Sequence, residues 1–154
     1  MKENYREITR TLIENSFPLL RDKRIHVFVG WLRFYAFSVW IPPHLRIIVL
    51  STRTGNLGRS EITGLIVHEL CHQQRYFEMG LRRYLIFAIK FIVSKNIRAS
   101  EEKATDRLTI EKGYGRELYN LSVITHKDRN HKKINDFYLT LEEIKSYSES
   151  LGKW

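Results

Sequence analysis

Cysteine is nearly absent from this sequence: Cys71 is the only one among 154 residues. A single thiol excludes an intramolecular disulfide and is typical of a reducing compartment, so we expect a cytoplasmic location. The N-terminal segment lacks the apolar run and the small-residue cleavage site of a secretory signal. No apolar run reaches the roughly 20 residues of a transmembrane helix, because the longest, from Leu81 to Ser94, is interrupted by Lys90.

Recognition patterns for nucleic acid are also absent, although basic residues are in excess. The formal net charge is +9, from 26 Lys and Arg against 17 Asp and Glu. The basic residues are scattered along the chain, which favours a solvated basic surface, and a nucleic-acid partner is an alternative that no motif indicates. With 43% apolar and 28% charged residues in 154, the composition is typical of one globular domain.

Hydrophobic periodicity predicts a β-rich first third between two helices. Apolar positions in residues 3–15 follow a helical spacing that Pro18 ends. Ser60 is the expected N-cap of a helix that runs to about Met79 and stops at Gly80. Between these helices we expect three strands and then a turn-rich loop, at residues 25–30, 31–40, 46–51 and 52–60.

The most apolar stretch of the chain runs from Leu81 to Ser94. Its length and the interruption at Lys90 favour a buried core helix. A helix lying on a membrane surface and a helix face that binds a partner are the alternatives. Contact with a membrane surface is therefore retained as a candidate interaction of this stretch.

The remainder of the chain is expected to be helical. A helix is predicted from Ser100 to Gly113, because its two early glutamates suit the positive N-terminus of a helix. The tail is then polar until Thr140. Thr140 and Glu143 have the spacing of a capping box, which predicts a last helix that ends near Leu151.

Two histidines four residues apart enclose a glutamate within the helix predicted after Ser60. Residues four apart project from one face of a helix, so His68 and His72 can offer ring nitrogens to one ion, and Zn²⁺ accepts such ligands. Glu69 is rotated around the helix, where its carboxylate would miss the metal but reach a water held there and take its proton. With six histidines in 154 residues, this pattern should arise by chance in about one such chain in fifty.

A third protein ligand is needed to define the type of site. Glu78, six residues after His72, is an unfavourable third ligand. A glycine at the position of Arg75 would be needed to end the helix there, and without it the helix continues and carries Glu78 away from the metal. Glu102 and Asp106 lie four apart on the next predicted helix. Glu102 could complete a site of two histidines and one carboxylate, and Asp106 could bind the outer nitrogen of a ligating histidine. Glu101 is the rival ligand by adjacency, and the pairing with Asp106 favours Glu102.

These elements resemble those of the gluzincin metallopeptidases. The run from His68 to His72 (HELCH) matches the HExxH helix of that family, and the run from Glu102 to Asp106 (EKATD) is similar to its glutamate-bearing second helix. The resemblance covers residues 62–115, about a third of the chain. In size the chain is similar to the compact minigluzincins, and its second motif resembles that of the HtpX-like membrane proteases.

The resemblance implies an α+β fold in which a small mixed or antiparallel sheet packs on the active-site helix. The length of the chain and the lack of a linker predict a single metallopeptidase-like domain over residues 1–154, divided into an N-terminal helix and strands (1–59), zinc-binding helices (60–115) and a helical tail (116–154). An edge strand of the sheet would align an extended substrate, and the strand at residues 46–51 is the candidate.

The resemblance also implies a zinc-dependent metalloendopeptidase acting on a peptide or protein substrate. His68, His72 and Glu102 would hold one Zn²⁺, Asp106 would support a ligand, and Glu69 would be the general base. The family also uses a Tyr or His to stabilise the oxyanion, and nothing in the sequence selects among Tyr114, Tyr119, His126 and His131. Cys71 precedes His72 by one residue, so it points away from the metal and is expected to be a buried small side chain.

Two alternatives to an active peptidase remain at this point. One is a basic module that binds nucleic acid or protein and carries a structural or non-catalytic zinc. The other concerns the segment from Leu121 to Trp154, which exceeds what the two motifs need. We expect this segment to complete the fold, and the alternative is that it blocks the cleft and keeps the enzyme latent.

Overall fold

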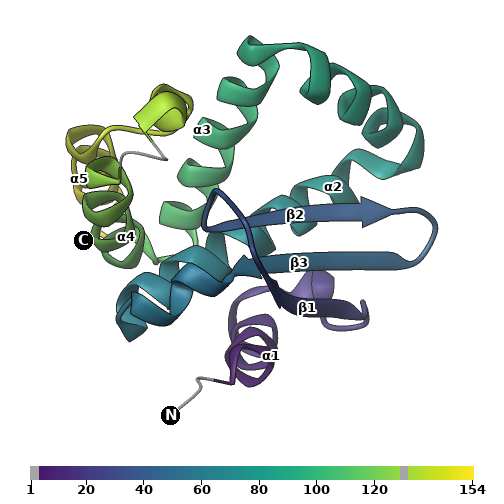
Figure 1. The fold of residues 1–154 in the computed structure, drawn as a ribbon, viewed down its shortest axis with the longest axis horizontal. Coiled ribbons are helices and arrows are strands. Elements are labelled where there is room, and N and C mark those ends of the chain that lie inside the picture. Colours follow the sequence, from purple (N-terminus) through teal and green to yellow (C-terminus); the bar gives the residue numbers. More distant parts are fainter. Residues whose placement is uncertain (1–3, 129–131) are drawn as a thin grey trace.

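The computed structural model of the chain describes residues 4–128 and 132–154 and places five α-helices around one three-stranded sheet (Figure 1). The predicted α+β class is therefore confirmed. The strands are β1 (Ile25–Gly30), β2 (Ala36–Ile41) and β3 (Leu45–Ser51). The helices are α1 (Tyr5–Ser16), α2 (Arg59–Val93), α3 (Lys95–Glu111), α4 (Gly115–Lys127) and α5 (Leu141–Ser150). Three short 3-10 segments complete the list, η1 (Pro18–Leu20), η2 (Thr52–Asn56) and η3 (Lys132–Phe137).

The sheet has the order β1-β3-β2, with β3 parallel to β1 and antiparallel to β2. The prediction that residues 46–51 form an edge strand is therefore wrong, because β3 has a hydrogen-bonded neighbour on each side. Among the described residues the free edges belong to β1 and β2. The strand predicted at residues 31–40 is also shorter than expected: its pairing with β3 begins at Ala36, opposite Leu50, and β3 ends one residue later at Ser51.

Two helices begin earlier in the chain than predicted. The N-cap of α2 is Gly58 instead of Ser60. Helix α3 begins at Lys95 instead of Ser100, because the side chain of Ser94 accepts a hydrogen bond from the Ile97 N–H. The capping box of Thr140 and Glu143 is confirmed, with both of its hydrogen bonds present.

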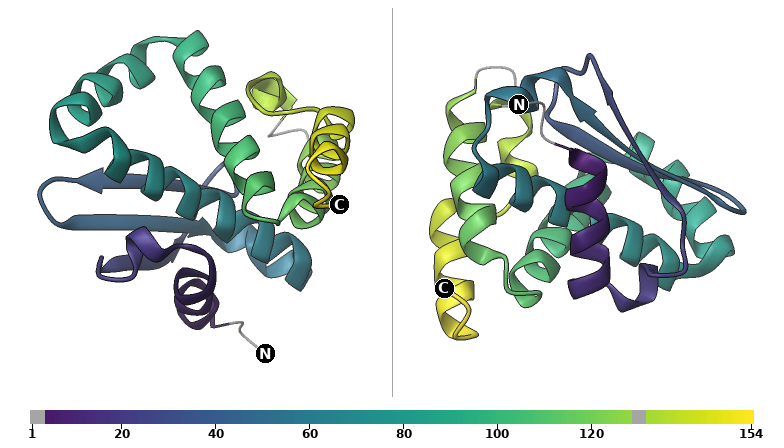
Figure 2. Two further views of the ribbon diagram at one scale, coloured as in Figure 1. Left: turned by 180° about the vertical axis from the view of Figure 1, so that it is seen from behind. Right: turned by 90° about the horizontal axis from the view of Figure 1, so that it is seen from below.

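The first half of α2 packs on the inner face of the sheet, and α1 packs in the same core (Figure 2). Ile66 and Leu70 of α2 are fully buried there with Ile48 and Leu50 of β3. Apolar burial on both sides of the motif residues therefore fixes the rotation of this helix.

Helix α2 changes direction at Gly80, whose φ of 71° and ψ of 168° interrupt the helical backbone. Residues 81–93, which we call the arm, leave the sheet and arch towards α3 (Figure 1). The prediction of a buried core helix here is wrong, because the arm exposes much of its apolar surface, including 74% of Ile92 and 76% of Val93. Among the described residues, no helix combines the length and the apolar character that crossing a bilayer requires.

The tail packs into the fold through α4 and α5. Helix α4, which the polar pattern before Thr140 did not reveal, packs on α2 and α5. A second core cluster joins Ile110 of α3 and Leu118 of α4 with Leu139 and Ile144. The tail is thus held by its own buried contacts with the two helices that carry the motifs.

Candidate metal centre

The three motif residues of α2 are all buried at the interface between α2 and α3. His68, Glu69 and His72 expose between 4% and 6% of their surface. Their neighbours on the helix anchor them, since Leu65 is buried and Leu70 is fully buried in the core of the sheet. Histidines with no partner are costly to bury, so their ring nitrogens need specific contacts at this interface.

Both histidines converge on one carboxylate oxygen of α3. The Nε2 atoms of His68 and His72 lie 3.1 and 3.2 Å from Oε2 of Glu102. One ligand atom from each of the three residues can be chosen so that all lie within 4.8 Å of one another. Ligands 2.0–2.1 Å from a tetrahedral ion are about 3.4 Å apart, close to the two distances from the histidines to Glu102, so this group could hold one metal ion.

The outer nitrogens of both histidines have partners that orient the rings. Nδ1 of His68 lies 3.0 Å from Oδ1 of Asp106, although the geometry falls short of a well-aligned hydrogen bond. Nδ1 of His72 lies 3.2 Å from Oγ1 of Thr105 and 3.6 Å from Oε1 of Glu101. Because these groups hold the outer nitrogens, the Nε2 atoms are left to face Glu102, which is the support that metal-ligating histidines require.

Glu101, the rival ligand, is engaged elsewhere. Arg75 donates two hydrogen bonds of 2.8 Å to its two carboxylate oxygens. The structure therefore places Glu102 at the convergence of the histidines and Glu101 on the outer side of His72. Glu78 lies outside the group: it is exposed and accepts a hydrogen bond from Gln74 on the same helix.

The side chains of the cluster form a network of charges. Burial lowers the pKa of His68, but Asp106 and Glu102 outweigh burial and hold that pKa well above its ordinary value. Burial likewise opposes the charge of His72, yet Glu102 and Glu101 raise its pKa to about 9. Burial raises the pKa of Glu102, but the two histidines reverse this and hold it below its ordinary value. The site is therefore built for positive charge beside Glu102, which a cation can supply in place of protons.

Glu69 makes no ion pair among the described residues, whereas Glu101, Glu102 and Asp106 each pair with a histidine or an arginine. Its Oε2 is buried and has no hydrogen-bond partner among the described residues. Burial raises the pKa of Glu69, and the two histidines only partly oppose this effect. A buried carboxylate oxygen without a donor is costly unless a ligand or water completes it, so this atom points to an occupant of the adjoining space.

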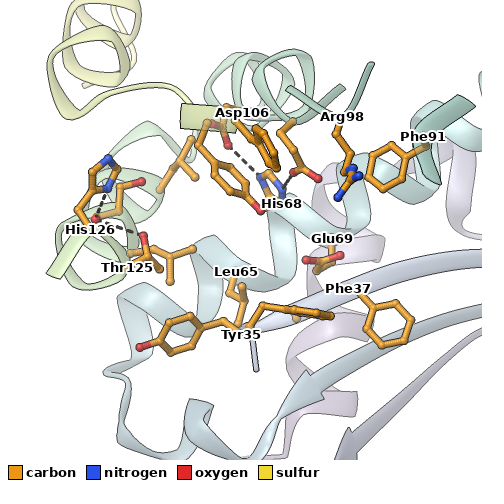
Figure 3. Close-up of a pocket in the computed structure, with 18 residues that line it drawn as sticks. Tyr35, Phe37, Leu65, His68, Glu69, Phe91, Arg98, Asp106, Thr125 and His126 are labelled. Atoms are coloured by element: carbon orange, nitrogen blue, oxygen red, sulfur yellow. Dashed lines mark hydrogen bonds and ion pairs between the residues drawn. The ribbon is translucent and has the colours of Figure 1, made fainter. Parts of the chain in front are cut away.

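A cavity of about 350 Å³ adjoins the cluster. Figure 3 shows Glu69 of α2 and Arg98 of α3 directed into it. Its walls are mostly apolar and come from β2, α2, α3, α4, η3 and Tyr138, which follows η3. The apolar side chains of the walls include those of Ala36, Phe37, Leu65, Phe91, Leu118 and Phe137. The cluster thus borders a space large enough for part of a peptide, on the side where Glu69 lies.

Tyr138 is the residue of this site that the sequence did not reveal. It lines the cavity, and its ring centroid lies 5.9 Å from that of His68. Burial, reinforced by Glu102 and Glu69, raises the pKa of Tyr138 well above its ordinary value, so the hydroxyl keeps its proton. No periodicity marks this position in the sequence. It is placed by the next residue, Leu139, whose N–H donates to Asp106 Oδ2 at 2.9 Å.

The other candidates for an oxyanion contact fall into three groups. Tyr114 and Tyr119 have structural partners, since the Tyr114 hydroxyl is 2.7 Å from Ser16 Oγ and the Tyr119 ring packs on Trp154. His126 lines the cavity, with Nδ1 2.8 Å from the carbonyl oxygen of Ser122. His131 lies outside the described residues.

No protein-family model, curated protein or solved structure matches this chain. The geometry by itself establishes a buried group of two histidines and one glutamate that could bind a metal ion.

Proposed function

We propose that the chain is a zinc-dependent peptidase of the gluzincin type. One observation carries the proposal: two imidazole nitrogens converge on Glu102, and the partnerless Oε2 of Glu69 is buried beside them at a cavity. Two nitrogens and one carboxylate oxygen suit Zn²⁺, and three protein ligands leave the fourth position that a catalytic site needs. The supporting residues Asp106 and Thr105 are those that hold ligating histidines in place.

Each residue of the site has a chemical role in this proposal. When bound, Zn²⁺ supplies Lewis acidity, which polarises the scissile carbonyl and lowers the pKa of the attacking water. Glu69 accepts a proton from that water at Oε2 and delivers it to the leaving amine as the C–N bond breaks. Tyr138, with its protonated hydroxyl, is our candidate for the donor that stabilises negative charge on the carbonyl oxygen.

The free edge of β2 is our candidate for the strand that aligns the substrate. The N–H of Trp40 points off the sheet to the hydroxyl of Tyr84, so by alternation the backbone groups of Ala36 and Ser38 point to the same edge. Ser38 also donates from its side chain to the carbonyl of Glu69 at 2.9 Å. An extended peptide that pairs with β2 would therefore pass beside Glu69, and main-chain pairing requires no particular sequence.

The decisive experiment compares Glu69→Gln with Glu78→Gln on the same helix. Both remove one negative charge, but Glu78 is exposed and lies outside the cluster. With an unfolded protein as substrate and Zn²⁺ present, we expect Glu69→Gln to bind zinc and lose cleavage by about 10³-fold or more. Glu78→Gln should cleave as the wild type does. Cleavage by Glu69→Gln at the wild-type rate would show that the proposed base is wrong.

The alternative of a binding module with a structural zinc predicts four protein ligands and no open position. Among the described residues the metal-capable group has three members, which favours the catalytic reading. X-ray absorption of the zinc-loaded protein separates the two. Four protein ligands, together with no cleavage of any peptide library and salt-sensitive binding to nucleic acid, would replace our proposal with this alternative.

A further inference from the structure

The arm carries apolar side chains on two opposite faces. The inner face consists of Tyr84, Phe87, Ala88 and Phe91, and Tyr84 packs on Trp40 and Tyr76. The outer face consists of Leu85, Ile86, Ile89, Ile92 and Val93, whose exposed fractions range from 49% to 76%. A helix at a protein surface normally turns polar residues outward, and a contiguous exposed apolar face marks an interaction surface.

Charge of one sign surrounds this outer face. Between Glu78 and Glu101 the sequence contains no acidic residue and five basic ones, Arg82, Arg83, Lys90, Lys95 and Arg98. Arg82, Arg83 and Lys90 belong to the arm itself and are exposed. An apolar helix face beside lysines and arginines is the composition of helices that lie in the interface of an anionic membrane.

We propose that the arm docks on an anionic lipid surface, with its outer face in the lipid interface and its basic residues at the headgroups. The shape of the arm is compatible with this docking, because the arm protrudes from the protein as an arch (Figures 1 and 2). A protruding helix can be accommodated by a deformable bilayer. A second copy of the chain is disfavoured as the occupant, since it would bring two basic surfaces together. No helix among the described residues is long and apolar enough to cross a bilayer, and in this proposal the arm lies flat on the membrane surface.

Docking at the arm would orient the cavity. Phe91 belongs to the arm and lines the cavity, and so does Arg98 just beyond it on α3. The cavity would therefore lie close to the lipid headgroups, where chain segments next to a membrane are within reach. The lipid interaction does not depend on the proposed peptidase activity, and it is measured without a substrate.

The test is sedimentation of the intact protein with vesicles. Phosphatidylcholine vesicles that contain about 30% phosphatidylserine are compared with phosphatidylcholine alone. We expect binding to the anionic vesicles only, weakened by added salt. Ile89→Ser combined with Ile92→Ser should reduce the partition coefficient by about tenfold or more, and Arg82→Gln combined with Arg83→Gln should also reduce it.

Two matched pairs distinguish the arm from general apolarity and charge. Leu19→Ser with Leu151→Ser changes residues that are 43% and 40% exposed and lie elsewhere. Arg10→Gln with Lys145→Gln removes two charges from α1 and α5. Both pairs should bind as the wild type does, and all variants should keep its thermal unfolding. The proposal is overturned if the protein does not bind the anionic vesicles, or if the arm variants and the control variants lose binding to the same extent. A dimer that only the Ile89 and Ile92 changes abolish would assign the face to a second copy.

Discussion

Asp106 accepts a hydrogen bond from the Leu139 N–H at 2.9 Å, so one side chain of the second motif holds the tail in place. Its other oxygen lies 3.0 Å from Nδ1 of His68. The position of Tyr138 beside the cluster is thereby linked to the orientation of a proposed metal ligand. The tail forms a wall of the cavity instead of a separate appendage.

Replacing Asp106 should separate its two roles. Asp106→Asn retains an oxygen that can accept from Leu139, but it cannot act as an anionic acceptor for the His68 N–H. We expect Zn²⁺ affinity to fall by about 10–100-fold while stability changes little. Asp106→Ala should lose the same affinity and also destabilise the tail, because the buried N–H loses its acceptor. Competition with a fluorescent chelator and urea unfolding measure the two effects. Equal zinc affinity in Asp106→Asn and the wild type would contradict the supporting role.

The two adjacent glutamates should respond differently to amide substitution. Glu102→Gln removes the carboxylate on which both histidines converge, and we expect Zn²⁺ affinity to fall by more than about 100-fold. Glu101→Gln disturbs the contact with Arg75 and the outer side of His72, and the expected loss is about tenfold. The same chelator competition checks both. A larger loss in Glu101→Gln would reverse the assignment of the third ligand.

Local spacing accounts for how much of the site could be read from the sequence. His68 and His72, and likewise Glu102 and Asp106, are four residues apart, and helical geometry alone places each pair on one face. Which strand lies at the edge depends instead on the order of the three strands in the sheet. The hydrophobic pattern of each strand does not determine that order, and β3 lies in the centre. Tyr138 is held beside the cluster by contacts between distant parts of the chain, among them the hydrogen bond from the Leu139 N–H to Asp106 and the burial of Leu139, so no local signal could have found it.

The arm shows a different limit of sequence patterns. An apolar stretch of this length is compatible with a buried helix, because periodicity reports which faces are apolar and does not report what covers them. In the arm only the inner face, with Tyr84 and Phe87, packs against other side chains. The change of direction at Gly80 turns the outer face away from the core. The burial of Cys71, by contrast, was correctly predicted, because its position beside His72 fixes its direction.

The thiol of Cys71 should be unreactive in the folded protein. It is fully buried, and burial raises its pKa to about 12. Because the folded pKa lies above that of a free thiol, the protonated form persists as the pH rises through 9, where an unfolded chain would already ionise. At pH 8 we expect a thiol reagent to react only after unfolding in guanidinium. Rapid labelling of the native protein would indicate an accessible thiolate.

Tyr138→Phe tests the proposed contact with the carbonyl oxygen. The substitution removes one hydroxyl and keeps the ring beside His68. If Tyr138 stabilises charge that develops in the transition state, kcat should fall by about 10²-fold or more with little change in KM and none in zinc affinity. Tyr147→Phe is the control, because its hydroxyl donates to Glu111 at an exposed site. A rise in KM at constant kcat would instead indicate a role in substrate binding.

Gly64 should be intolerant of even a methyl group. A Cβ at this position would lie 2.6 Å from the carbonyl oxygen of Glu117 and 2.7 Å from its carbon, so α2 and α4 meet backbone to backbone. Alanine favours a helix over glycine by about 1 kcal/mol, but the backbone of α4 cannot move aside without disturbing both core clusters. We therefore expect Gly64→Ala to lower the free energy of unfolding by about 1–3 kcal/mol. Gly55→Ala, with no atom within 4 Å of the added carbon, should change it by less than about 0.5 kcal/mol. Urea unfolding measures both, and unchanged stability in Gly64→Ala would mean that the two helices are not held at this distance.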